Sequence, residues 1–419
     1  MRPVLCNTLD SGGGAAIAAR RLHLGLRSLG DDSVLAVMQQ SGDTPGVHAL
    51  TSRLRRTMQP FIRQAERLPL LCYPNRDRGA LFSPSWRPSG VHRRIKALRP
   101  DVVHLHWIAD SFLPLHSLAR LGVPIVWTLH DAWALTGGCH ILKGCEGYRH
   151  GCGRCPQLGS GSGVDMSSLG YALRKSAYKR LNLTIAAPSR HLELLAKSSP
   201  LLQHFPIVRI PNGVDTDRFR PINQGLARQM LQLPQDVPLV VFGAVSPGRD
   251  HNKGFDLLCA ALRALPAPLR DQVRCMVFGG SVTAGEVPFS VIELGHLHDD
   301  VALALAYSAA DVFICPSREE NLPNTIMEAL ACGTPVAAFR TGGIPDMIAH
   351  GENGVLAPCF DVKALADGIA WLVQCAPEKK EQLRNAARQK ALGEYSLPSI
   401  AQRYHDLYLV TLAHTSQIM

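Results

Sequence analysis

Long apolar runs are missing from the sequence. No hydrophobic stretch approaches the roughly 20 residues that a membrane-spanning helix needs, and the opening residues, MRPVLCNTLDSGGG, lack the apolar core of a signal peptide. Low-complexity tracts and internal repeats are missing as well. These absences argue against a membrane-spanning or repeat protein, and they predict a globular, cytoplasmic one.

Aromatic residues are scarce, at 6% of the chain, and they do not alternate with basic residues as they do on surfaces that stack nucleic-acid bases. The formal charge of +10 lies in one stretch: residues 51–100 hold 12 Lys or Arg against Glu66 and Asp77, whereas the remainder holds 32 basic and 32 acidic residues. This excess of positive charge favours an anionic membrane surface or a charged substrate, more than nucleic acid, as the binding partner of residues 51–100. The alternative is a surface that only contacts solvent.

Short apolar runs alternate with helical patterns along the whole chain. PVLCNTL, SVLAVM, DVVHLHWI, PIVWTLH and LTIAAPS come first, and a second series consists of PLVVFGAV, QVRCMVFGG, FSVIELG, DVFICPS and TPVAAF. This alternation is typical of buried parallel strands joined by helical crossovers. Because 419 residues also exceed the size of a single core, we expect two α/β domains.

The boundary between the two series falls in FPIVRIPNGVDTDRFRP, which is rich in Pro, Asn, Gly and Asp. We predict two Rossmann-like, doubly wound domains, residues 1–208 and 209–397, that face an interdomain cleft. Ligands of such sheets bind at the carboxyl ends of the strands, so the functional residues are expected in loops that follow strands.

A glycine-rich turn follows the first predicted strand. Gly12 and Gly13 allow backbone N–H groups to approach a phosphate or sugar oxygen closely, with the positive end of the next helix behind them. The turn lacks the full glycine pattern of dinucleotide-binding proteins, so a plain tight turn is the alternative.

The stretch SREENLPNTIMEALACGTPVA carries two carboxylates eight residues apart. Glu320 follows a predicted strand, and Glu328 lies more than one turn into the helix that Pro323 begins. Asn324 and Thr325 would offer N–H groups to an anion at the start of that helix. Because two carboxylates would repel a phosphate, we expect them to accept hydrogen bonds from sugar hydroxyls; an exposed acidic loop is the alternative.

Two cations follow the strand PLVVFGAV. Arg249 and Lys253 lie in SPGRDHNKGFDLL, just before a helical pattern. Cations at this position would neutralise a departing diphosphate without a metal ion. Plain surface solvation is the alternative.

Histidines cluster at the ends of two predicted strands, where DVVHLHW and VWTLHD place His104, His106 and His130. A histidine in such a run is more often a hydrogen-bonded structural residue. His130, which Asp131 follows, is the best placed of the three to touch a sugar.

Four cysteines gather in GGCHILKGCEGYRHGCGRCPQ, whereas most of the others stand alone in apolar runs. In a reducing compartment, four nearby thiols favour a tetrahedral structural zinc over disulfides. Reduced packing cysteines and a redox role are the alternatives, because only one pair has C-x-x-C spacing. The predicted ligands are Cys139, Cys145, Cys152 and Cys155.

EENLPNTIMEALACGTPVA, the helix start KGFDLL, IPNGVDTDRF and the glycine-rich turn together resemble retaining glycosyltransferases of family 4, which have the GT-B fold. The resemblance covers nearly the whole chain, and its most specific element is the Glu-x7-Glu motif with its ALACGTPV continuation. WTLHDAWALTGGCH with the four cysteines looks more narrowly like enzymes that build bacterial exopolysaccharide, colanic-acid and lipopolysaccharide chains.

The resemblance implies roles for individual residues. Glu320 would contact the hydroxyls of the donor sugar, Glu328 the nucleotide ribose, and Lys253 the diphosphate. His130 would lie beside the donor sugar, so the predicted catalytic residues are Glu320, His130 and Lys253. The predicted donor site contains Gly12, Gly13, Arg249, Lys253, Glu320, Asn321, Leu322, Asn324, Thr325 and Glu328.

The resemblance also implies a reaction. A hexose would pass from a UDP- or GDP-sugar to a hydroxyl of a lipid-linked or growing polysaccharide, with retained anomeric configuration and no catalytic metal. The first domain would receive the acceptor at the inner face of the plasma membrane, and residues 398–419 would pack back on it. The alternatives are a sugar-nucleotide epimerase or phosphorylase of this fold and a non-catalytic, zinc-anchored binding module.

One departure from the family pattern concerns the phosphate-binding arginine. The family's arginine stands at the end of a strand, about six residues before the lysine, whereas the strand here ends in FGAV and Arg249 lies four residues before Lys253. Either Arg249 substitutes for it, or Lys253 and helix ends hold the phosphate alone.

Overall fold

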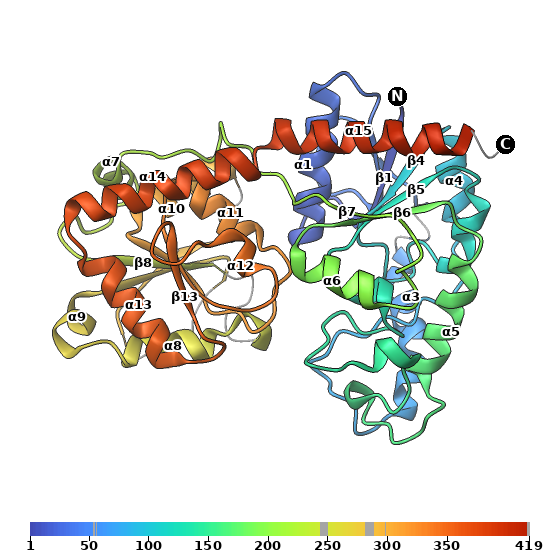
Figure 1. Ribbon diagram of the computed structural model, residues 1–419, viewed down its shortest axis with the longest axis horizontal. Coiled ribbons are helices and arrows are strands. Elements are labelled where there is room, and N and C mark those ends of the chain that lie inside the picture. Colours follow the sequence, from blue (N-terminus) through green and yellow to red (C-terminus); the bar gives the residue numbers. More distant parts are fainter. Residues whose placement is uncertain (53–54, 56, 244–249, 281–288, 298, 417–419) are drawn as a thin grey trace. The chain divides into compact units, whose positions relative to one another are not determined.

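The computed structural model describes residues 1–416 apart from 53–54, 56, 244–249, 281–288 and 298. The chain divides into unit 1, which comprises Met1–Gly213 and Pro398–Met419, and unit 2, which comprises Val214–Leu397. The sequence predicts boundaries after residues 208 and 397. Each unit is an α/β domain with its own parallel sheet (Figure 1).

Unit 1 is built on a seven-stranded sheet with the order β3-β2-β1-β4-β5-β6-β7, in which every neighbouring pair is parallel. Three-residue strands form both edges, and no apolar run long enough to predict them occurs there. The strands are β1 (Pro3–Leu9), β2 (Val34–Gln39), β3 (Val47–Ala49), β4 (Val102–Leu105), β5 (Ile125–Thr128), β6 (Leu183–Ala187) and β7 (Ile207–Arg209).

Helices of unit 1 connect these strands. They are α1 (Gly14–Ser28), α3 (Gln59–Arg67), α4 (Val91–Ala97), α5 (Met166–Tyr178) and α6 (Arg190–Ser198). Short 3-10 turns complete the unit, namely η1 (Leu68–Cys72), η2 (Leu115–Arg120), η3 (Trp133–Leu135), η4 (Gly147–His150) and η5 (Pro156–Leu158).

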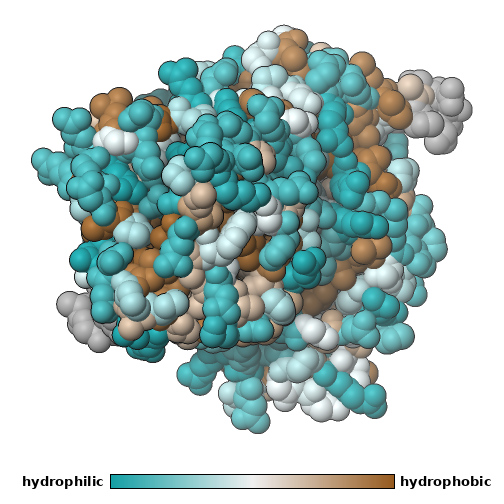
Figure 2. Space-filling view, turned by 60° about the vertical axis from the view of Figure 1, so that its left-hand side comes forward, coloured by the Kyte–Doolittle hydropathy of each residue, from teal (hydrophilic) through white to brown (hydrophobic). Residues whose placement is uncertain are grey.

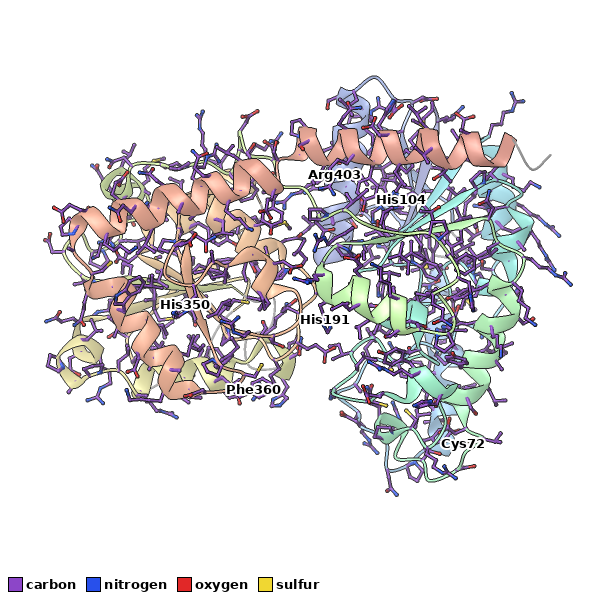
Figure 3. All side chains as sticks on the ribbon, viewed as in Figure 1. Cys72, His104, His191, His350, Phe360 and Arg403 are labelled. Atoms are coloured by element: carbon purple, nitrogen blue, oxygen red, sulfur yellow. The ribbon has the colours of Figure 1, made fainter. Side chains whose placement is uncertain are left out.

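The last helix, α15 (Leu397–Ser416), packs on the sheet of unit 1 (Figure 1). Its Tyr408 hydroxyl lies 2.6 Å from Nδ1 of His104, and its Tyr404 hydroxyl lies 2.7 Å from Oγ1 of Thr128. His104 is fully buried beneath this helix, and its Nε2 meets Oγ1 of Thr128 at 2.7 Å (Figure 3). His104 is therefore a hydrogen-bonded structural residue, the more frequent role of a histidine in such a run, because both ring nitrogens are used inside the core.

Unit 2 has a six-stranded sheet with the order β10-β9-β8-β11-β12-β13. The strands are β8 (Leu239–Gly243), β9 (Arg274–Phe278), β10 (Val291–Gly295), β11 (Val312–Cys315), β12 (Val336–Phe339) and β13 (Gly354–Ala357). The helices are α7 (Gln224–Met230), α8 (Phe255–Arg263), α9 (Ala267–Gln272), α10 (Asp300–Ala309), α11 (Asn324–Ala331), α12 (Ile344–Met347), α13 (Val362–Gln374) and α14 (Pro377–Glu394), with the 3-10 turn η6 (His251–Lys253).

Apolar side chains on both faces of each sheet form the cores. In β1, Val4 and Cys6 belong to one hydrophobic cluster and Leu5 to another, as the period-2 alternation of a strand requires. Both strand orders are those of doubly wound sheets, and the order reverses between β1 and β4 and between β8 and β11. The predicted pair of Rossmann-like domains is confirmed, and loops at these two reversal points are where ligands of such sheets bind.

Residues 59–72 form helix α3 followed by the 3-10 turn η1. Pro60 lies in the first turn of α3, where its missing N–H is not needed, so it begins this helix. In the part of the chain that the structure describes, no helix is both long and apolar enough to cross a bilayer. Hydrophilic side chains cover most of the face in Figure 2, with hydrophobic residues in scattered patches.

Candidate functional site

The loop between β11 and α11 is fixed by hydrogen bonds from two neighbouring loops. Nδ2 of Asn252 donates to the Glu319 carbonyl (2.8 Å), and Oδ1 of Asn252 accepts from the Glu319 N–H (3.1 Å). The N–H of Gly343 donates to the Glu320 carbonyl (2.9 Å). The protein itself therefore fixes the backbone around Glu320, at the reversal point of the sheet of unit 2.

Lys253 and Glu320 form an ion pair at this point. Nζ of Lys253 lies 2.6 Å from Oε1 of Glu320, although 67 residues separate them in sequence. The Glu320 carboxylate holds the pKa of Lys253 above its usual range, so the ammonium is charged at every physiological pH. The Lys253 side chain is 37% exposed and that of Glu320 is 14% exposed, which leaves the cation accessible to an anion.

Two glycines allow the loops to approach this closely. Gly254 has φ +70°, and a Cβ there would lie 2.0 Å from the Pro316 carbonyl oxygen. Gly342 has φ +52°, and a Cβ there would lie 1.8 Å from the Glu320 carbonyl oxygen. Both positions combine a left-handed backbone with a contact that excludes any side chain.

Helix α11 begins at Asn324, directly after the Glu320 loop. Its N-cap residue is Pro323, which has no side-chain acceptor, and the Thr325 side chain is half-buried. Glu328 is 4% exposed, and its Oε2 accepts a hydrogen bond from the Tyr307 hydroxyl (3.0 Å). The helix start thus provides N–H groups beside the Lys253–Glu320 pair, and Tyr307 fixes the second carboxylate.

In unit 1, the glycine-rich turn lies at the end of β1. Gly12 and Gly13 are exposed with φ of +76° and +99°, and open space surrounds the position of a Cβ at each. Oδ2 of Asp10 accepts hydrogen bonds from the backbone N–H groups of Ser41 (2.8 Å) and Gly42 (3.1 Å), which ties the turn to the end of β2. The turn leads directly into α1, so it can present backbone N–H groups to a ligand.

A second group of polar residues in unit 1 follows β4 and β5. Nδ1 of His106 lies 2.8 Å from Nε2 of His130, and burial lowers the pKa of His130 to about 4. Oδ2 of Asp131 accepts from Nδ1 of His140 (2.6 Å) and from Nε1 of Trp107 (3.0 Å). His106, Trp107, His130 and Asp131 line a small hollow here, and His130 is neutral at physiological pH.

Known sequences match both units. The description "Glycosyltransferase Family 4" fits residues 12–218, and "Glycosyl transferases group 1" fits residues 242–390. D-inositol 3-phosphate glycosyltransferase 1 of Catenulispora acidiphila is 30% identical over 311 residues, which cover 70% of this chain and 68% of that protein. The chain belongs to the group 1, family 4 glycosyltransferases.

Other known proteins resemble this chain over a shorter stretch of sequence or in fold alone. D-inositol 3-phosphate glycosyltransferase of Saccharomonospora viridis is 35% identical over 195 residues, and the match covers only 44% of that protein. The sucrose-phosphate synthase of Thermosynechococcus elongatus superposes with a TM-score of 0.69 at 20% identity over 99% of both chains. Anabaena HepE in complex with UDP-glucose superposes with a TM-score of 0.64 at 17% identity over 100% of both chains.

These comparisons support the family but not the narrower resemblance. The two sequence relatives described above are named for D-inositol 3-phosphate, whereas the sequence predicts an exopolysaccharide, colanic-acid or lipopolysaccharide enzyme. That narrower prediction is not confirmed. The solved structures are below 25% identity and show the GT-B fold alone.

Most of the residues predicted to bind the donor lie in loops where the strand order of a sheet reverses. Lys253, Glu320, Asn321, Leu322, Asn324 and Thr325 lie together in unit 2, and Glu328 follows one turn later in α11. Gly12, Gly13 and His130 belong to unit 1. Arg249 lies outside the described residues, so its suggested role as a substitute arginine stays a prediction.

No metal site is found at the predicted zinc ligands of the cysteine loop. Among the described residues, which include all four cysteines, no three His, Cys, Asp or Glu side chains are arranged to hold one metal ion. Burial raises the pKa of Cys139 to about 12 and that of Cys152 to about 11. Cys145 and Cys155 are likewise free thiols. The structural zinc is therefore not confirmed.

Sequence reasoning missed several residues that build the site. Arg318 Nη2 donates to Asp256 Oδ2 (2.6 Å) and so joins the Glu320 loop to α8, while Tyr307 supports Glu328. A tyrosine or arginine in a helix or loop gives no local signal of such a role. Gly342, the first glycine of TGGIP, was the available signal in the sequence, because a glycine near a strand often marks the close approach of another backbone segment.

Proposed function

We propose that this protein transfers a hexose from a nucleotide diphosphate sugar to an acceptor hydroxyl with retention of anomeric configuration. The observation that carries the proposal is the Lys253–Glu320 pair beside the start of α11. Its accessible ammonium and the N–H groups of Asn324 and Thr325 supply positive charge for a diphosphate, and the Glu320 carboxylate supplies an acceptor for sugar hydroxyls.

The chemistry follows from where charge develops. As the bond between the anomeric carbon and the phosphate oxygen breaks, negative charge grows on the diphosphate, so Lys253 and the α11 start stabilise the transition state more than the ground state. The departing phosphate oxygen takes the proton of the acceptor hydroxyl, and the acceptor oxygen bonds to the anomeric carbon on the same face. This scheme assigns no general base and no metal ion to the protein. Glu320 orients the sugar and offsets positive charge at the anomeric carbon.

We propose that unit 1 binds the acceptor. Its own polar residues at the ends of β4 and β5, with neutral His130, offer hydrogen bonds to a sugar without a competing charge. The relatives named for D-inositol 3-phosphate support a hydroxyl-rich ring as the acceptor. A lipid-linked oligosaccharide, which the sequence predicts, presents the same chemistry.

The donor class can be tested with a panel of UDP-, GDP- and ADP-hexoses. We expect one nucleotide series to raise the thermal unfolding midpoint of the protein and to be hydrolysed slowly without an acceptor. Lys253→Met should abolish most of that stabilisation, because the diphosphate loses its cation. Lys390→Met, which removes a lysine from an exposed ion pair on α14, serves as the matched control.

The products separate the proposal from other activities of this fold. Transfer yields a nucleoside diphosphate and a new α- or β-linkage of the same configuration as the donor, which NMR reads directly. Epimerised nucleotide sugar, or sugar 1-phosphate formed from a glycan and phosphate, would instead establish an epimerase or a phosphorylase. Inversion of the linkage would contradict the retaining mechanism.

We also propose that the surface of α3 and η1 contacts an anionic membrane. Phe61, Leu68 and Leu71 are 66%, 54% and 70% exposed, and the half-exposed Arg63 and Arg67 lie on the same segment. Exposed apolar side chains interspersed with cations are the composition of interfacial helices. This surface would bring unit 1 to a lipid-linked acceptor.

Liposome flotation tests the membrane contact. We expect the protein to float with vesicles of phosphatidylglycerol and phosphatidylcholine at low salt and to be released at high salt. Phe61→Ser with Leu71→Ser should prevent flotation, whereas Leu169→Ser with Leu173→Ser, exposed residues of α5, should not. Equal flotation of both variants, or none by the wild type, would contradict the proposal.

A further inference from the structure

Asp131 is a carboxylate of unit 1 that the proposed reaction leaves unused. It lies just beyond the end of β5, and its side chain is 21% exposed. With His106, Trp107 and His130 it lines the small hollow described above, which has room for about one water-sized group. A single hydroxyl fits there, whereas a sugar ring stays outside. The carboxylate is therefore accessible, but only to a small group.

The protein holds the Asp131 carboxylate with three hydrogen-bond donors. Oδ1 accepts from the Trp133 N–H (2.8 Å), and Oδ2 accepts from Nδ1 of His140 (2.6 Å) and Nε1 of Trp107 (3.0 Å). Burial raises the pKa of Asp131, but His140 and these hydrogen bonds outweigh burial and hold the pKa below its usual range. A carboxylate can accept about four hydrogen bonds, so the group is a fixed anion that can still accept one more.

A buried cation supports this anion from behind. Arg174 of α5 is fully buried, and its guanidinium carbon lies 4.6 Å from the centre of the Trp133 ring. Nε of Arg174 donates to the carbonyl of the same tryptophan (3.2 Å), whose N–H donates to Asp131. The guanidinium also interacts electrostatically with Asp131, so each charge offsets part of the cost of burying the other.

His140 is held at both of its ring nitrogens. Nδ1 meets Asp131, and Nε2 lies 2.9 Å from Oγ of Ser83. Helix α3 fixes the segment of Ser83, because its buried Glu66 accepts a hydrogen bond on Oε1 from the Ser85 N–H (2.8 Å). The imidazole therefore cannot turn away from Asp131 without breaking a second hydrogen bond.

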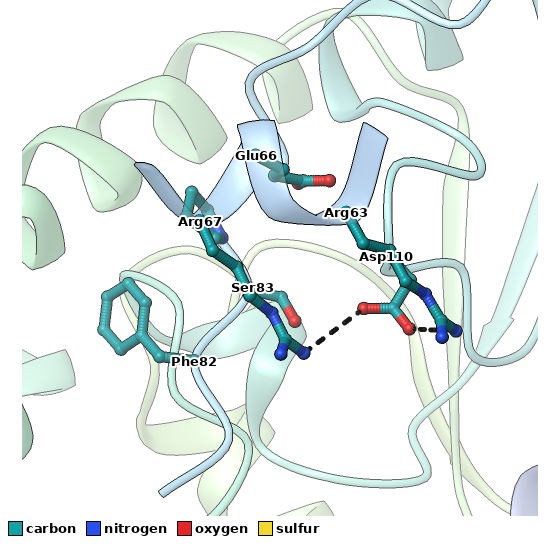
Figure 4. A pocket seen from close by; sticks show the side chains of 7 residues that line it. Arg63, Glu66, Arg67, Phe82, Ser83 and Asp110 are labelled. Carbon is teal, nitrogen blue, oxygen red and sulfur yellow. Dashed lines mark ion pairs between the residues drawn. The ribbon is translucent and has the colours of Figure 1, made fainter. Parts of the chain in front are cut away.

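The hollow carries the negative charge of Asp131, and its described lining includes no lysine or arginine. Arg63 and Arg67 of α3 are directed at Asp110 instead, with Nη2 of Arg63 2.6 Å from Oδ2 and Nη2 of Arg67 3.9 Å from Oδ1 (Figure 4). Burial lowers the pKa of His130 to about 4, so this neighbour is neutral. A phosphate or carboxylate in the hollow would be repelled, whereas a hydroxyl would donate a hydrogen bond.

We propose that Asp131 binds one hydroxyl of an acceptor sugar or cyclitol and thereby selects acceptors that carry no phosphate at that ring position. The hydroxyl donates a hydrogen bond to the carboxylate, and the ring lies outside the hollow. His140 is a positioning residue, which acts by holding the carboxylate. The assignment rests on the proposed function, which places the acceptor on unit 1.

Binding of paired probes to the full chain tests the selectivity. The pairs are glucose and glucose 6-phosphate, mannose and mannose 6-phosphate, and myo-inositol and myo-inositol 1-phosphate, each followed by saturation-transfer NMR. We expect at least one neutral probe to bind about 10-fold more tightly than its phosphorylated partner, and Asp131→Asn to remove most of this preference. Asp32→Asn, in an exposed ion pair of unit 1 with Arg2, is the matched control and should keep the preference.

Two isosteric variants of His140 test the positioning role. The amide of His140→Asn can donate from the place of Nδ1 and keep the bond to Asp131, whereas that of His140→Gln reaches the place of Nε2 and keeps the bond to Ser83. We expect the asparagine variant to stay within about threefold of the wild-type preference and the glutamine variant to lose it, at similar thermal unfolding midpoints. Equal preferences in the two variants would show that His140 is merely structural.

The outcomes distinguish this assignment from the proposed function. If a nucleotide sugar is hydrolysed but Asp131→Asn leaves the relative binding of the paired probes unchanged, Asp131 does not select the acceptor and the proposed function stands. If no nucleotide sugar is bound, the proposed function fails, and a preference that depends on Asp131 would still show a sugar site. Tighter binding of the phosphorylated probes to the wild type, or no binding of any neutral probe, would overturn the assignment.

Discussion

Glutamine in place of Glu320 should lower the turnover of sugar transfer about 10²–10³-fold, as the loss of one electrostatic contact does in other enzymes. The substitution keeps the shape of the side chain but removes the charge that pairs with Lys253 at 2.6 Å. The donor sugar then loses both an acceptor for its hydroxyls and a negative charge near the anomeric carbon. Steady-state kinetics with the donor identified in the nucleotide panel measure the effect, which should appear in kcat.

Methionine in place of Lys253 has a comparable effect with a different signature. It removes the cation proposed to neutralise the diphosphate and takes away the ion-pair partner of Glu320, so KM for the donor should rise while kcat falls. The double variant Lys253→Met/Glu320→Gln should lose less than the product of the two single losses, because the residues act as a pair.

The control is another ion pair of unit 2. Lys390 and Glu394 form an exposed i,i+4 pair on α14 at 2.7 Å, and the same substitutions there should leave turnover unchanged. Wild-type turnover of Glu320→Gln would show that Glu320 does not contact the reacting sugar.

Alanine in place of Gly342 should destabilise the protein and also slow its turnover. The added Cβ would lie 1.8 Å from the Glu320 carbonyl oxygen, and the residue would keep a left-handed φ of +52°. Left-handed strain and steric overlap together cost about 2–4 kcal/mol of unfolding free energy. Because a shift of about 1 Å in a substrate-binding group costs about 10²-fold in rate, the folded fraction should also turn over about 100-fold more slowly.

The variant Gly351→Ala separates the effect of left-handed strain from that of steric overlap. Gly351 has φ +81°, but open space surrounds the position of its Cβ, so alanine there adds strain without overlap. We expect a loss of about 1–2 kcal/mol in urea denaturation and normal turnover of the folded protein. If Gly342→Ala behaved like this control, the close packing against Glu320 would have no role in catalysis.

The fold followed from local patterns to a large extent. The runs PVLCNTL and DVFICPS contain β1 and β11, because the hydrophobic pattern of a strand is a property of adjacent residues. The strands β3 and β7 were missed, since three residues carry too little periodicity to stand out, and β13 was missed as well. The place of Pro60 in the first turn of α3 could not be predicted, because it depends on where the helix begins.

By itself, the sequence determined the α/β class, the two parallel sheets and the set of residues that follow strands, because each depends on hydrophobic period and on the order of elements. Only the tertiary structure decided which other side chains those residues contact. Lys253 reaches Glu320 because β8 and β11 are neighbours in the sheet, and His104 is structural because α15 returns over unit 1 from the far end of the chain. Glu66 is likewise buried only after α3 packs beside Asp110, since burial is a property of the folded chain.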